Sequence, residues 1–385
     1  MIDFELDAGQ QQLRDVVRRF TEEEVAPRVV EYNRKGQVPE DLVAQIIDLG
    51  LVGGVVPTEY GGSGMDYVTW SICVEELARY CTSLAAIVGY PSSLAGQGLL
   101  GWGTEDQKRR FLDPLARGEC LAATAITEPE AGSDAAALRT TATRTTGGFL
   151  ISGQKTWISN ANTCRWMMLF ATVDREAGRR GITAFLVDRE TKGLVTRPLK
   201  HKLSNRASDT GEVFLDEVFV EDDRVLGGVG EGWPILLAAV NAGRLHVAAR
   251  SVGIAQGALD LSVDYARQRR SFGRPIAEHQ LVAANLAEMS VQVETARLTV
   301  WRAARALDKG EVNANYWPSV AKLHAGRVAM SVAHSAVQLH GAYGLSDEYH
   351  VERHFREAKM QEIVDGTNEI QLMIIARERL KKRTG

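Results

Sequence analysis

The most constraining feature of the sequence is an apolar seam between residues 282 and 307. Its members are spaced alternately four and three residues apart and comprise Val282, Leu286, Met289, Val293, Ala296, Val300, Ala303 and Leu307. Such a heptad pattern predicts a long helix that packs lengthwise in an antiparallel bundle. Its small and medium side chains would suit the face of a partner subunit equally well. The last third of the chain is therefore expected to be a bundle of long helices.

The periodicity of the sequence changes twice along the chain. Residues 1–120 carry helical apolar stripes, one of which joins Leu13, Val16, Val17 and Phe20. From residue 121 short β-rich runs replace them and predict a small antiparallel sandwich or barrel up to residue 228. Helical periodicity returns over 229–385. This order predicts an α+β multidomain protein and disfavours a Rossmann enzyme, in which strands and helices alternate.

The composition narrows the function classes. Of 385 residues 45% are apolar and 24% are charged, which is typical of a soluble globular protein. The net charge of -4 gives no reason to expect nucleic acid or an anionic membrane as a partner. Four scattered cysteines without C-x-x-C spacing predict free thiols, and no apolar run has the length of a signal or membrane span. The expected location is the cytoplasm.

One turn near the C-terminus is the strongest candidate for chemistry. In residues 361–371, Asp365 directly precedes Gly366-Thr367-Asn368, and an apolar, helical run follows. Glycine frees the backbone, and Thr or Asn can cap a new helix. Taken alone, the segment is better interpreted as an ordinary loop with a solvated aspartate. A carboxylate held on such a turn is nevertheless well placed to act as a base.

Four other segments gain meaning only in combination. Residues 124–134 form a hydroxyl-rich turn, and Trp157 follows in a β region where a tryptophan is usually core. Residues 269–276 are a basic, aromatic turn that suits either a phosphate or solvent, and 338–344 contain two glycines after a helix. The His350–His354 pair lacks a third ligand and the H-E-x-x-H order, so no metal is predicted.

Together and in order, these segments resemble the acyl-CoA dehydrogenase family over essentially the whole chain, and most closely its short-chain, butyryl-CoA type. Residues 127–134 resemble the family's flavin and substrate loop, and 157–160 resemble its Trp-Ile-Thr flavin wall. Residues 269–273, 338–344 and 365–371 match its three C-terminal signatures. The resemblance implies an N-terminal α-helical domain, a middle β domain and a C-terminal four-helix bundle.

The resemblance also implies FAD, bound between the β domain and the bundle and shared across a dimer of a homotetramer. Residues expected at the isoalloxazine or completing the flavin site are Ile126, Thr127, Trp157, Ser159, Thr367 and Glu369. Residues expected to hold the adenosine and pyrophosphate from the neighbouring subunit are Arg269, Phe272, Gln280, Gln338, Gly341 and Ala342. Residues expected at the acyl-thioester substrate are Ser133, Asn241, Arg244 and Gly366.

The implied reaction is α,β-dehydrogenation of a short acyl-CoA in fatty-acid or branched-chain metabolism. Asp365 would remove the α-proton while hydride leaves the β-carbon for flavin N5. The thioester oxygen would accept hydrogen bonds from the backbone N–H of Asp365 and from a ribityl hydroxyl. An electron-transfer flavoprotein would then take the electrons.

Departures from the family pattern leave the substrate and the acceptor open. Asp365 replaces the usual Glu and is one methylene, about 1.5 Å, shorter, which favours a branched or cyclic short acyl group. Asn241 replaces an Asp near the CoA adenine, so a carrier-protein substrate stays open, and Ser159 keeps the hydroxyl of the usual Thr. His246 and His340 are unusual at their positions in the family's motifs. For His246 the preferred interpretation is a hydrogen-bonded core histidine, and the alternative is a residue that faces the substrate cleft. A flavin oxidase or monooxygenase and a non-catalytic flavin-binding subunit are the alternatives.

Overall fold

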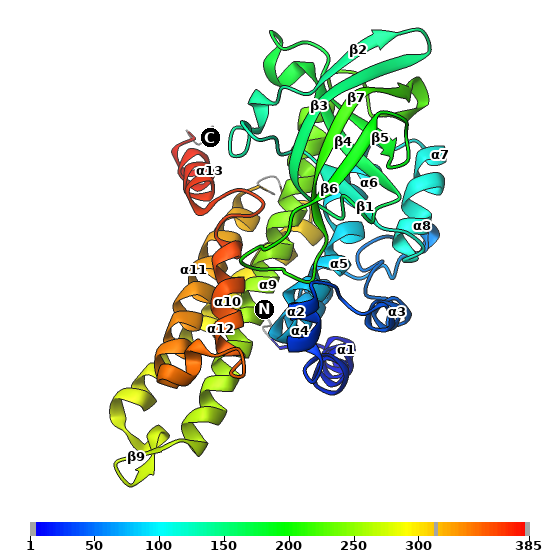
Figure 1. Cartoon of the computed structure of the whole chain (residues 1–385). Coiled ribbons are helices and arrows are strands. Elements are labelled where there is room, and N and C mark those ends of the chain that lie inside the picture. Colours follow the sequence, from blue (N-terminus) through cyan, green and yellow to red (C-terminus); the bar gives the residue numbers. More distant parts are fainter. Residues whose placement is uncertain (1–4, 312–314, 382–385) are drawn as a thin grey trace.

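The computed structural model describes residues 5–311 and 315–381 of the chain (Figure 1). Its α-helices are α1 (Ala8–Phe20), α2 (Val29–Lys35), α3 (Glu40–Asp48), α4 (Tyr67–Tyr80), α5 (Thr82–Ser92), α6 (Leu94–Trp102), α7 (Glu105–Gln107), α8 (Asp113–Ala116), α9 (Gly232–Gln268), α10 (Gln280–Asp308), α11 (Tyr316–His340), α12 (Val351–Gln361) and α13 (Asn368–Leu380). Short helical turns are η1 (Thr21–Val25), η2 (Thr58–Tyr60), η3 (Lys108–Leu112), η4 (Ala135–Ala137), η5 (Gly178–Gly181), η6 (Asp222–Arg224), η7 (Ile276–Glu278) and η8 (Gly341–Leu345).

The strands are β1 (Ala122–Ala125), β2 (Thr141–Thr145), β3 (Gly148–Ser159), β4 (Trp166–Thr172), β5 (Ile182–Asp188), β6 (Leu194–Pro198), β7 (Thr210–Glu221), β8 (Val225–Leu226), β9 (Arg270–Ser271) and β10 (Arg274–Pro275). The main sheet has the order β6-β7-β3-β2-β4-β5-β8, with β1 paired to β4. Most pairings are antiparallel, but β1 and β2 each pair with β4 in parallel. The expected β domain is therefore present, and the described strands do not close into a barrel.

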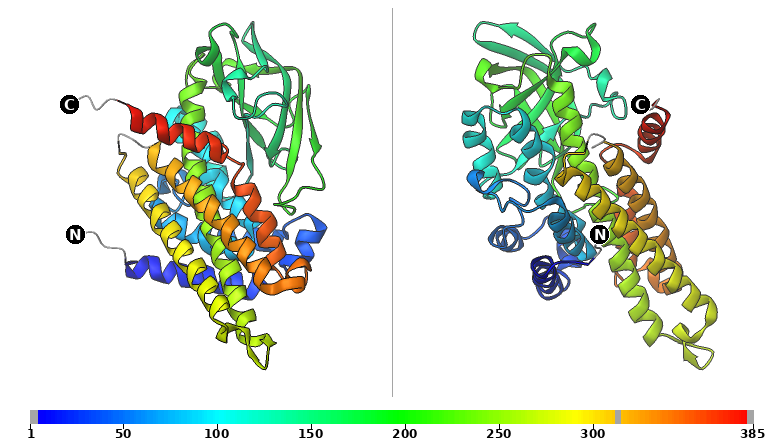
Figure 2. Two further views of the ribbon diagram at one scale, coloured as in Figure 1. Left: turned by 90° about the vertical axis from the view of Figure 1, so that its left-hand side faces the viewer. Right: turned by 180° about the vertical axis from the view of Figure 1, so that it is seen from behind.

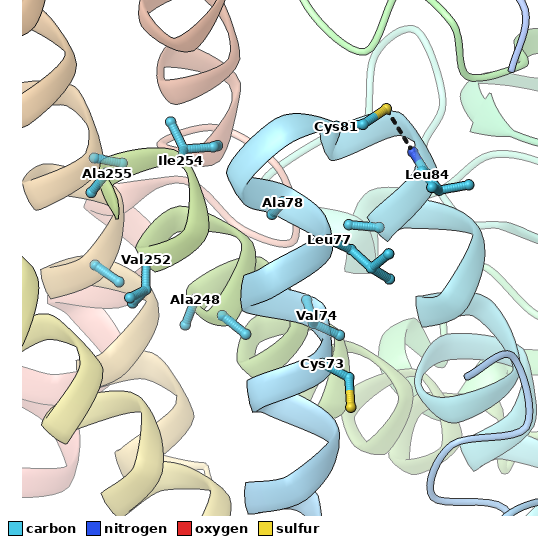
Figure 3. Close-up of a cluster of buried hydrophobic side chains, with 14 of the residues drawn as sticks. Cys73, Val74, Leu77, Ala78, Cys81, Leu84, Ala248, Val252, Ile254 and Ala255 are labelled. Atoms are coloured by element: carbon cyan, nitrogen blue, oxygen red, sulfur yellow. Dashed lines mark hydrogen bonds between the residues drawn. The ribbon is translucent and has the colours of Figure 1, made fainter. Parts of the chain in front are cut away.

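The first helices pack against the start of the C-terminal bundle. Figure 3 shows the contact between α4 and α9, with Leu77 and Ala78 on one helix and Ala248 and Val252 on the other. An added Cβ at Gly253 would lie 2.3 Å from the Glu75 carbonyl oxygen. The two backbones therefore approach as closely as a glycine allows, and the interface holds the N-terminal helices firmly on the bundle.

The predicted bundle and its seam are confirmed. Helices α9, α10 and α11 pack lengthwise, α12 lies against α9 and α11, and α13 packs on α11. The central seam residues Met289, Val293, Ala296, Val300 and Ala303 are buried, and the outer members Val282, Leu286 and Leu307 are half-buried. The seam thus closes the bundle within this chain along most of its length.

Helix α9 connects the two ends of the molecule. With 37 residues it is about 55 Å long at 1.5 Å per residue. Its first residue, Gly232, lies against β5, where an added Cβ would be 2.9 Å from the Ile182 carbonyl oxygen. Its far end leads into the β9–β10 hairpin, at the opposite tip from the β domain in all views (Figures 1 and 2). In the described ranges, no helix is long and apolar enough to cross a membrane.

Candidate active site

The turn between α12 and α13 has a backbone conformation that its sequence specifies. Asp365 has φ +52° and Gly366 has φ +93°, and Asp and Gly are among the residues that tolerate this left-handed region best. Thr367 caps α13, because its Oγ1 accepts a hydrogen bond from the Ile370 N–H at 3.4 Å. The buried Gln371 donates through Nε2 to the Gly366 carbonyl at 2.8 Å. The Asp365 side chain therefore projects from a fixed turn.

The Asp365 carboxylate lies directly against the backbone of α9. A Cβ added to Gly243 would be 2.7 Å from Asp365 Oδ2 and 3.2 Å from Leu94 Cδ2. Distances under 3.0 Å are essentially never seen for a real Cβ, so a side chain here would force the carboxylate to move. The absence of a side chain at position 243 is what lets a short carboxylate occupy this point between α9, α6 and the turn.

Burial and three cations set the protonation behaviour of Asp365. Burial raises the pKa of the Asp365 carboxyl, and the positive charges of Lys322, Arg250 and Arg244 oppose this shift without reversing it. A raised pKa makes a carboxylate a better proton acceptor, while the cations favour its ionised form. The group is half-buried, so the interpretation as an ordinary solvated loop residue is wrong.

The cations beside Asp365 are held by neutral partners. Arg244 is 6% exposed and donates through Nη1 to Asn241 Oδ1 at 2.7 Å. Lys322 is fully buried, and its Nζ lies 3.4 Å from Asn368 Oδ1. Burial lowers the pKa of Lys322 to about 8 and that of Arg244 to about 10. Neither cation is tied to a carboxylate by an ion pair in the described part of the chain, so their charge acts on Asp365 from a short distance.

The turn also offers a hydrogen-bond donor. Its neighbouring amides are used, since Val364 N–H bonds to the Met360 carbonyl at 3.1 Å and Asn368 N–H to the Glu362 carbonyl at 2.9 Å. The N–H of Asp365 donates to no acceptor among residues 5–311 and 315–381. Backbone donors left open beside a carboxylate are a common way to hold a substrate oxygen.

A second group of predicted residues gathers in the β domain around a buried ion pair. Lys155 Nζ lies 2.8 Å from Glu128 Oε1 and donates to the Ile126 carbonyl at 3.0 Å. The Thr156 N–H bonds to the Thr127 carbonyl at 2.9 Å. Ile126 and Thr127 are thus fixed alongside β3, while Ser133, further along the same segment, is exposed.

Trp157 points away from the core, contrary to the interpretation of a buried tryptophan. It is 62% exposed and has φ +59°, at a register shift in the β3–β7 pairing between Lys155 and Ile158. Such irregularities re-aim a side chain and are common next to active sites. An exposed indole held in a left-handed conformation fits the wall of a flat aromatic ligand, with the half-buried Ser159 two residues further on.

The remaining predicted cofactor residues, apart from Thr367 and Glu369 beside the Asp365 turn, lie at the opposite tip of the molecule. Arg269 directly follows α9, and its guanidinium lies 5.4 Å from the Tyr343 ring centre. Phe272 is 95% exposed. Gln280 and Gln338 are exposed on α10 and α11, Gly341 and Ala342 are exposed in η8, and Glu369 is exposed in the first turn of α13. Because α9 is about 55 Å long, one chain does not bring its tip and Trp157 to the same ligand.

The unusual histidines occupy different environments. His340 stacks on Tyr265 with 4.2 Å between ring centres, and its Nδ1 lies 2.8 Å from the Ala336 carbonyl oxygen, so it is a core residue. His246 is buried beside Trp70, yet neither ring nitrogen has a hydrogen-bond partner in the described residues. The ring nitrogens of His354 face the carbonyls of His350 and Arg79, and no cluster of metal-ligating side chains occurs in the described ranges.

Sequence reasoning missed Lys322 and Arg250. Lys322 had a detectable signal, since it stands on the small-residue face of its helix between Ser319 and Ala325, where a charge must be buried. Arg250 had none, because α9 is buried nearly all round and no stripe separates its faces.

The sequence matches three family profiles along its length. They are the acyl-CoA dehydrogenase N-terminal domain over residues 7–119, the middle domain over 123–218 and the C-terminal domain over 230–380. The chain is 38% identical to an acyl-CoA dehydrogenase of Bacillus subtilis, covering 95% of this chain and 96% of that one. It is 36% identical to the caffeyl-CoA reductase-Etf complex subunit CarC of Acetobacterium woodii, covering 96% and 98%.

Solved structures give the same picture. The butyryl-CoA dehydrogenase of Megasphaera elsdenii superposes with a TM-score of 0.96 at 36% identity, covering 99% of this chain and 100% of that one. The prolyl acyl carrier protein oxidase AnaB superposes with a TM-score of 0.93 at 29% identity, covering 97% and 100%.

Proposed function

Because the chain belongs to the acyl-CoA dehydrogenase family, we propose that it dehydrogenates a short acyl thioester, with Asp365 as the base for the α-proton. The observation that supports this proposal most directly is the environment of the Asp365 carboxylate. It is half-buried, has a raised pKa and lies against Gly243 beside Arg244. Branched and cyclic acyl groups are included, since a shorter base suits a closer or more substituted α-carbon. The proposed domains are 1–120, 121–228 and 229–385.

The enzyme is a flavoprotein with FAD as its cofactor, as in its family. When bound, FAD supplies the acceptor for the hydride that leaves the β-carbon. We propose that Ile126, Thr127, Trp157 and Ser159 hold its ring system, since Trp157 and Ser159 lie on β3 and Ile126 and Thr127 lie alongside it. The exposed indole of Trp157 supports this fit, because it offers a flat face in a fixed backbone.

The residues at the tip of the bundle would serve the FAD of a neighbouring copy. Arg269, Phe272 and Gln280 lie at the hairpin end of the long helix α9, too far from Trp157 to contact the same cofactor within one chain. Gln338, Gly341 and Ala342 lie at that tip as well. This separation supports the family's homotetramer, in which two subunits complete each flavin site, with Thr367 and Glu369 near the catalytic turn.

The geometry of the turn supports the proposed proton transfer. The ionised Asp365 accepts the α-proton, while its own N–H donates to the thioester oxygen and stabilises the negative charge that develops there. Arg244 and Lys322 keep the carboxylate ionised before the transfer. Asn241 fixes Arg244 by accepting a hydrogen bond from it. We propose that Ser133 and Gly366 also contact the acyl thioester.

The electron acceptor would be an electron-transfer flavoprotein in the cytoplasm, since CarC is named as a subunit of a reductase-Etf complex. AnaB favours a second candidate, an oxidase acting on an acyl group held by a carrier protein. The two differ in whether the reduced enzyme reacts with oxygen.

An acyl-CoA screen tests the proposal. The FAD-loaded enzyme is mixed without oxygen with straight, branched and cyclic short acyl-CoAs, and the loss of flavin absorbance is followed. Bleaching that reverses slowly in air but rapidly with electron-transfer flavoprotein is expected. Rapid reoxidation in air with release of peroxide would favour the oxidase. If only carrier-bound acyl groups bleach the flavin, the substrate is an acyl group on a carrier protein and not an acyl-CoA.

A further inference from the structure

The inner face of α13 is polar, although this helix packs on α11 of the bundle (Figure 2). Its buried residues are Asn368 and Gln371, whereas Leu372 and Met373 are exposed. Gln371 holds the turn before the helix, since it donates to the Gly366 carbonyl at 2.8 Å. Because burying an amide is unfavourable unless its polar atoms are hydrogen-bonded, the contacts of Asn368 indicate what this residue does.

Asn368 lies between a buried lysine and a glutamate. Its Oδ1 accepts a hydrogen bond from Lys322 Nζ at 3.4 Å, and its Nδ2 donates to Glu362 Oε1 at 3.2 Å. The N–H of Asn368 donates to the Glu362 carbonyl at 2.9 Å, which fixes the residue from the backbone. An ammonium group only donates and a carboxylate only accepts, so the amide turns its oxygen to the lysine and its nitrogen to the glutamate. A neutral group thus separates two opposite charges.

Three carboxylates attract the Lys322 ammonium group. Burial lowers the pKa of Lys322, and the positive charge of Arg244 adds to this shift. The negative charges of Asp365, Glu362 and Glu369 oppose it. Lys322 is fully buried, yet no ion pair joins it to any of these carboxylates in the residues that the structure describes. A direct ion pair between Lys322 and Glu362 would be strongly attractive in such surroundings, and the Asn368 amide occupies the position between them.

The position of this ammonium group matters for Asp365. Burial raises the pKa of the Asp365 carboxyl, and Lys322 is the strongest of the three charges that oppose the rise, ahead of Arg250 and Arg244. If Lys322 paired with Glu362, that carboxylate would offset its charge, and Lys322 would stabilise the ionised form of Asp365 less.

We propose that Asn368 is a positioning residue for the base: it holds the Lys322 ammonium group near Asp365 and keeps it from pairing with Glu362. This inference rests on the proposed function, because it takes Asp365 to be the base. Asn368 acts through the charge of Lys322 and not on the reacting atoms. Removal of its amide should therefore change the pH at which Asp365 becomes active, while the rate of the enzyme with an ionised Asp365 changes little.

The pH profile of kcat/KM tests the proposal, because its acid limb reports the ionisation of the base in the free enzyme. It is measured on the FAD-loaded enzyme with the acyl-CoA that bleaches the flavin fastest. In Asn368→Ala, Lys322 pairs with Glu362 and the pKa of Asp365 rises, so the acid limb should move to higher pH by about one unit. Asn368→Ser keeps a hydroxyl that can accept and donate, and it should move the limb less. An acid limb that stays at its wild-type pH in Asn368→Ala would overturn the inference.

A double variant and a control show whether Asn368 acts through Lys322. Once Lys322→Met has removed the charge, adding Asn368→Ala should move the acid limb no further. A further shift of the same size would show a direct effect of Asn368 and contradict the inference. Asn33→Ala is the control, because Asn33 on α2 is 8% exposed and Asn368 is 7% exposed. Its acid limb should coincide with that of wild type. A shift as large as in Asn368→Ala would mean that the loss of any buried amide moves the limb, and the inference would fail.

Failure of the proposed function gives a different result. If Asp365→Asn bleaches the flavin as fast as wild type, or if no acyl-CoA bleaches it, the proposed base and the positioning role fall together. If Asp365→Asn is slow but the acid limb does not move in Asn368→Ala, the proposed base stands and only the role of Asn368 falls.

Discussion

Two buried lysines lie near carboxylates in this molecule. The difference between the two sites distinguishes a carboxylate that stabilises the fold from one that is available for catalysis. In the β domain, Lys155 and Glu128 form an ion pair 2.8 Å long. In the bundle, Lys322 reaches the amide of Asn368 at 3.4 Å and forms no ion pair with Asp365 in the described residues. Burial lowers the pKa of each lysine to about 8.

The carboxylates respond in opposite directions. Burial alone would raise the pKa of Glu128, but the charge and hydrogen bond of Lys155 bring it below the ordinary value. Burial raises the pKa of Asp365, and its more distant cations do not reverse the shift. A carboxylate whose oxygens accept hydrogen bonds and form an ion pair stabilises the fold. A carboxylate with oxygens that accept no hydrogen bond and with a raised pKa is available to take a proton.

The largest expected effect is on catalysis by the unpaired carboxylate. Asp365→Asn removes the base but keeps the size of the side chain, so the rate of anaerobic flavin bleaching should fall by about 10²- to 10⁴-fold. Stopped-flow absorbance measures it. Asp264→Asn, an exposed change on α9, should bleach at the wild-type rate. Equal rates in the Asp365 variant and the control would show that the proton goes elsewhere.

The paired carboxylate should matter for stability instead. Lys155→Met leaves the Glu128 charge buried without its partner, which lowers the free energy of unfolding by about 3–5 kcal/mol. Urea denaturation followed by circular dichroism measures the change. Lys35→Met breaks an exposed pair with Glu31 and should have no measurable effect. If both variants are equally stable, the ion pair between Lys155 and Glu128 does not stabilise the fold.

The contact with Gly243 predicts a steric effect on the base. In Gly243→Ala the new Cβ would meet Asp365 Oδ2 at 2.7 Å and displace the carboxylate. A misplacement of about 1 Å costs roughly a hundredfold in kcat/KM. Gly101→Ala is the control, because a Cβ there meets no atom within 4 Å. An unchanged kcat/KM in Gly243→Ala would mean that the carboxylate lies elsewhere in the working enzyme.

The smallest effect should come from Lys322. Its positive charge lowers the pKa of Asp365, so Lys322→Met raises that pKa further. Because the ionised form is the base, activity rises with pH through this pKa, and the acid limb of the kcat/KM profile should move to higher pH. Rates on the plateau above the limb should change little. If the acid limb does not move, Lys322 does not influence the pKa of Asp365.

Much of this arrangement could be predicted from the sequence, but specific parts of it could not. The heptad seam and the change to β-rich runs are local patterns, and both led to the observed elements. The Thr367 cap was also readable, since capping depends on neighbours in sequence. The exposure of Trp157 was not, because it arises from a register shift against β7.

The environment of Asp365 depends on contacts between distant segments. Gly243, Lys322 and Arg250 come from three places on α9 and α11, and only packing brings them to the turn. Periodicity indicates which face of a helix is buried, but not which atoms meet there.

The role of Asp365 can be tested most directly by exchange of the α-hydrogens of butyryl-CoA in D₂O on the reduced enzyme, where oxidation cannot proceed. Proton NMR follows the loss of the α-hydrogen signal. We expect exchange on the wild-type enzyme and at least a hundredfold slower exchange on Asp365→Asn, as for loss of a general base. Exchange at the same rate on both proteins would contradict the assignment of Asp365 as the base.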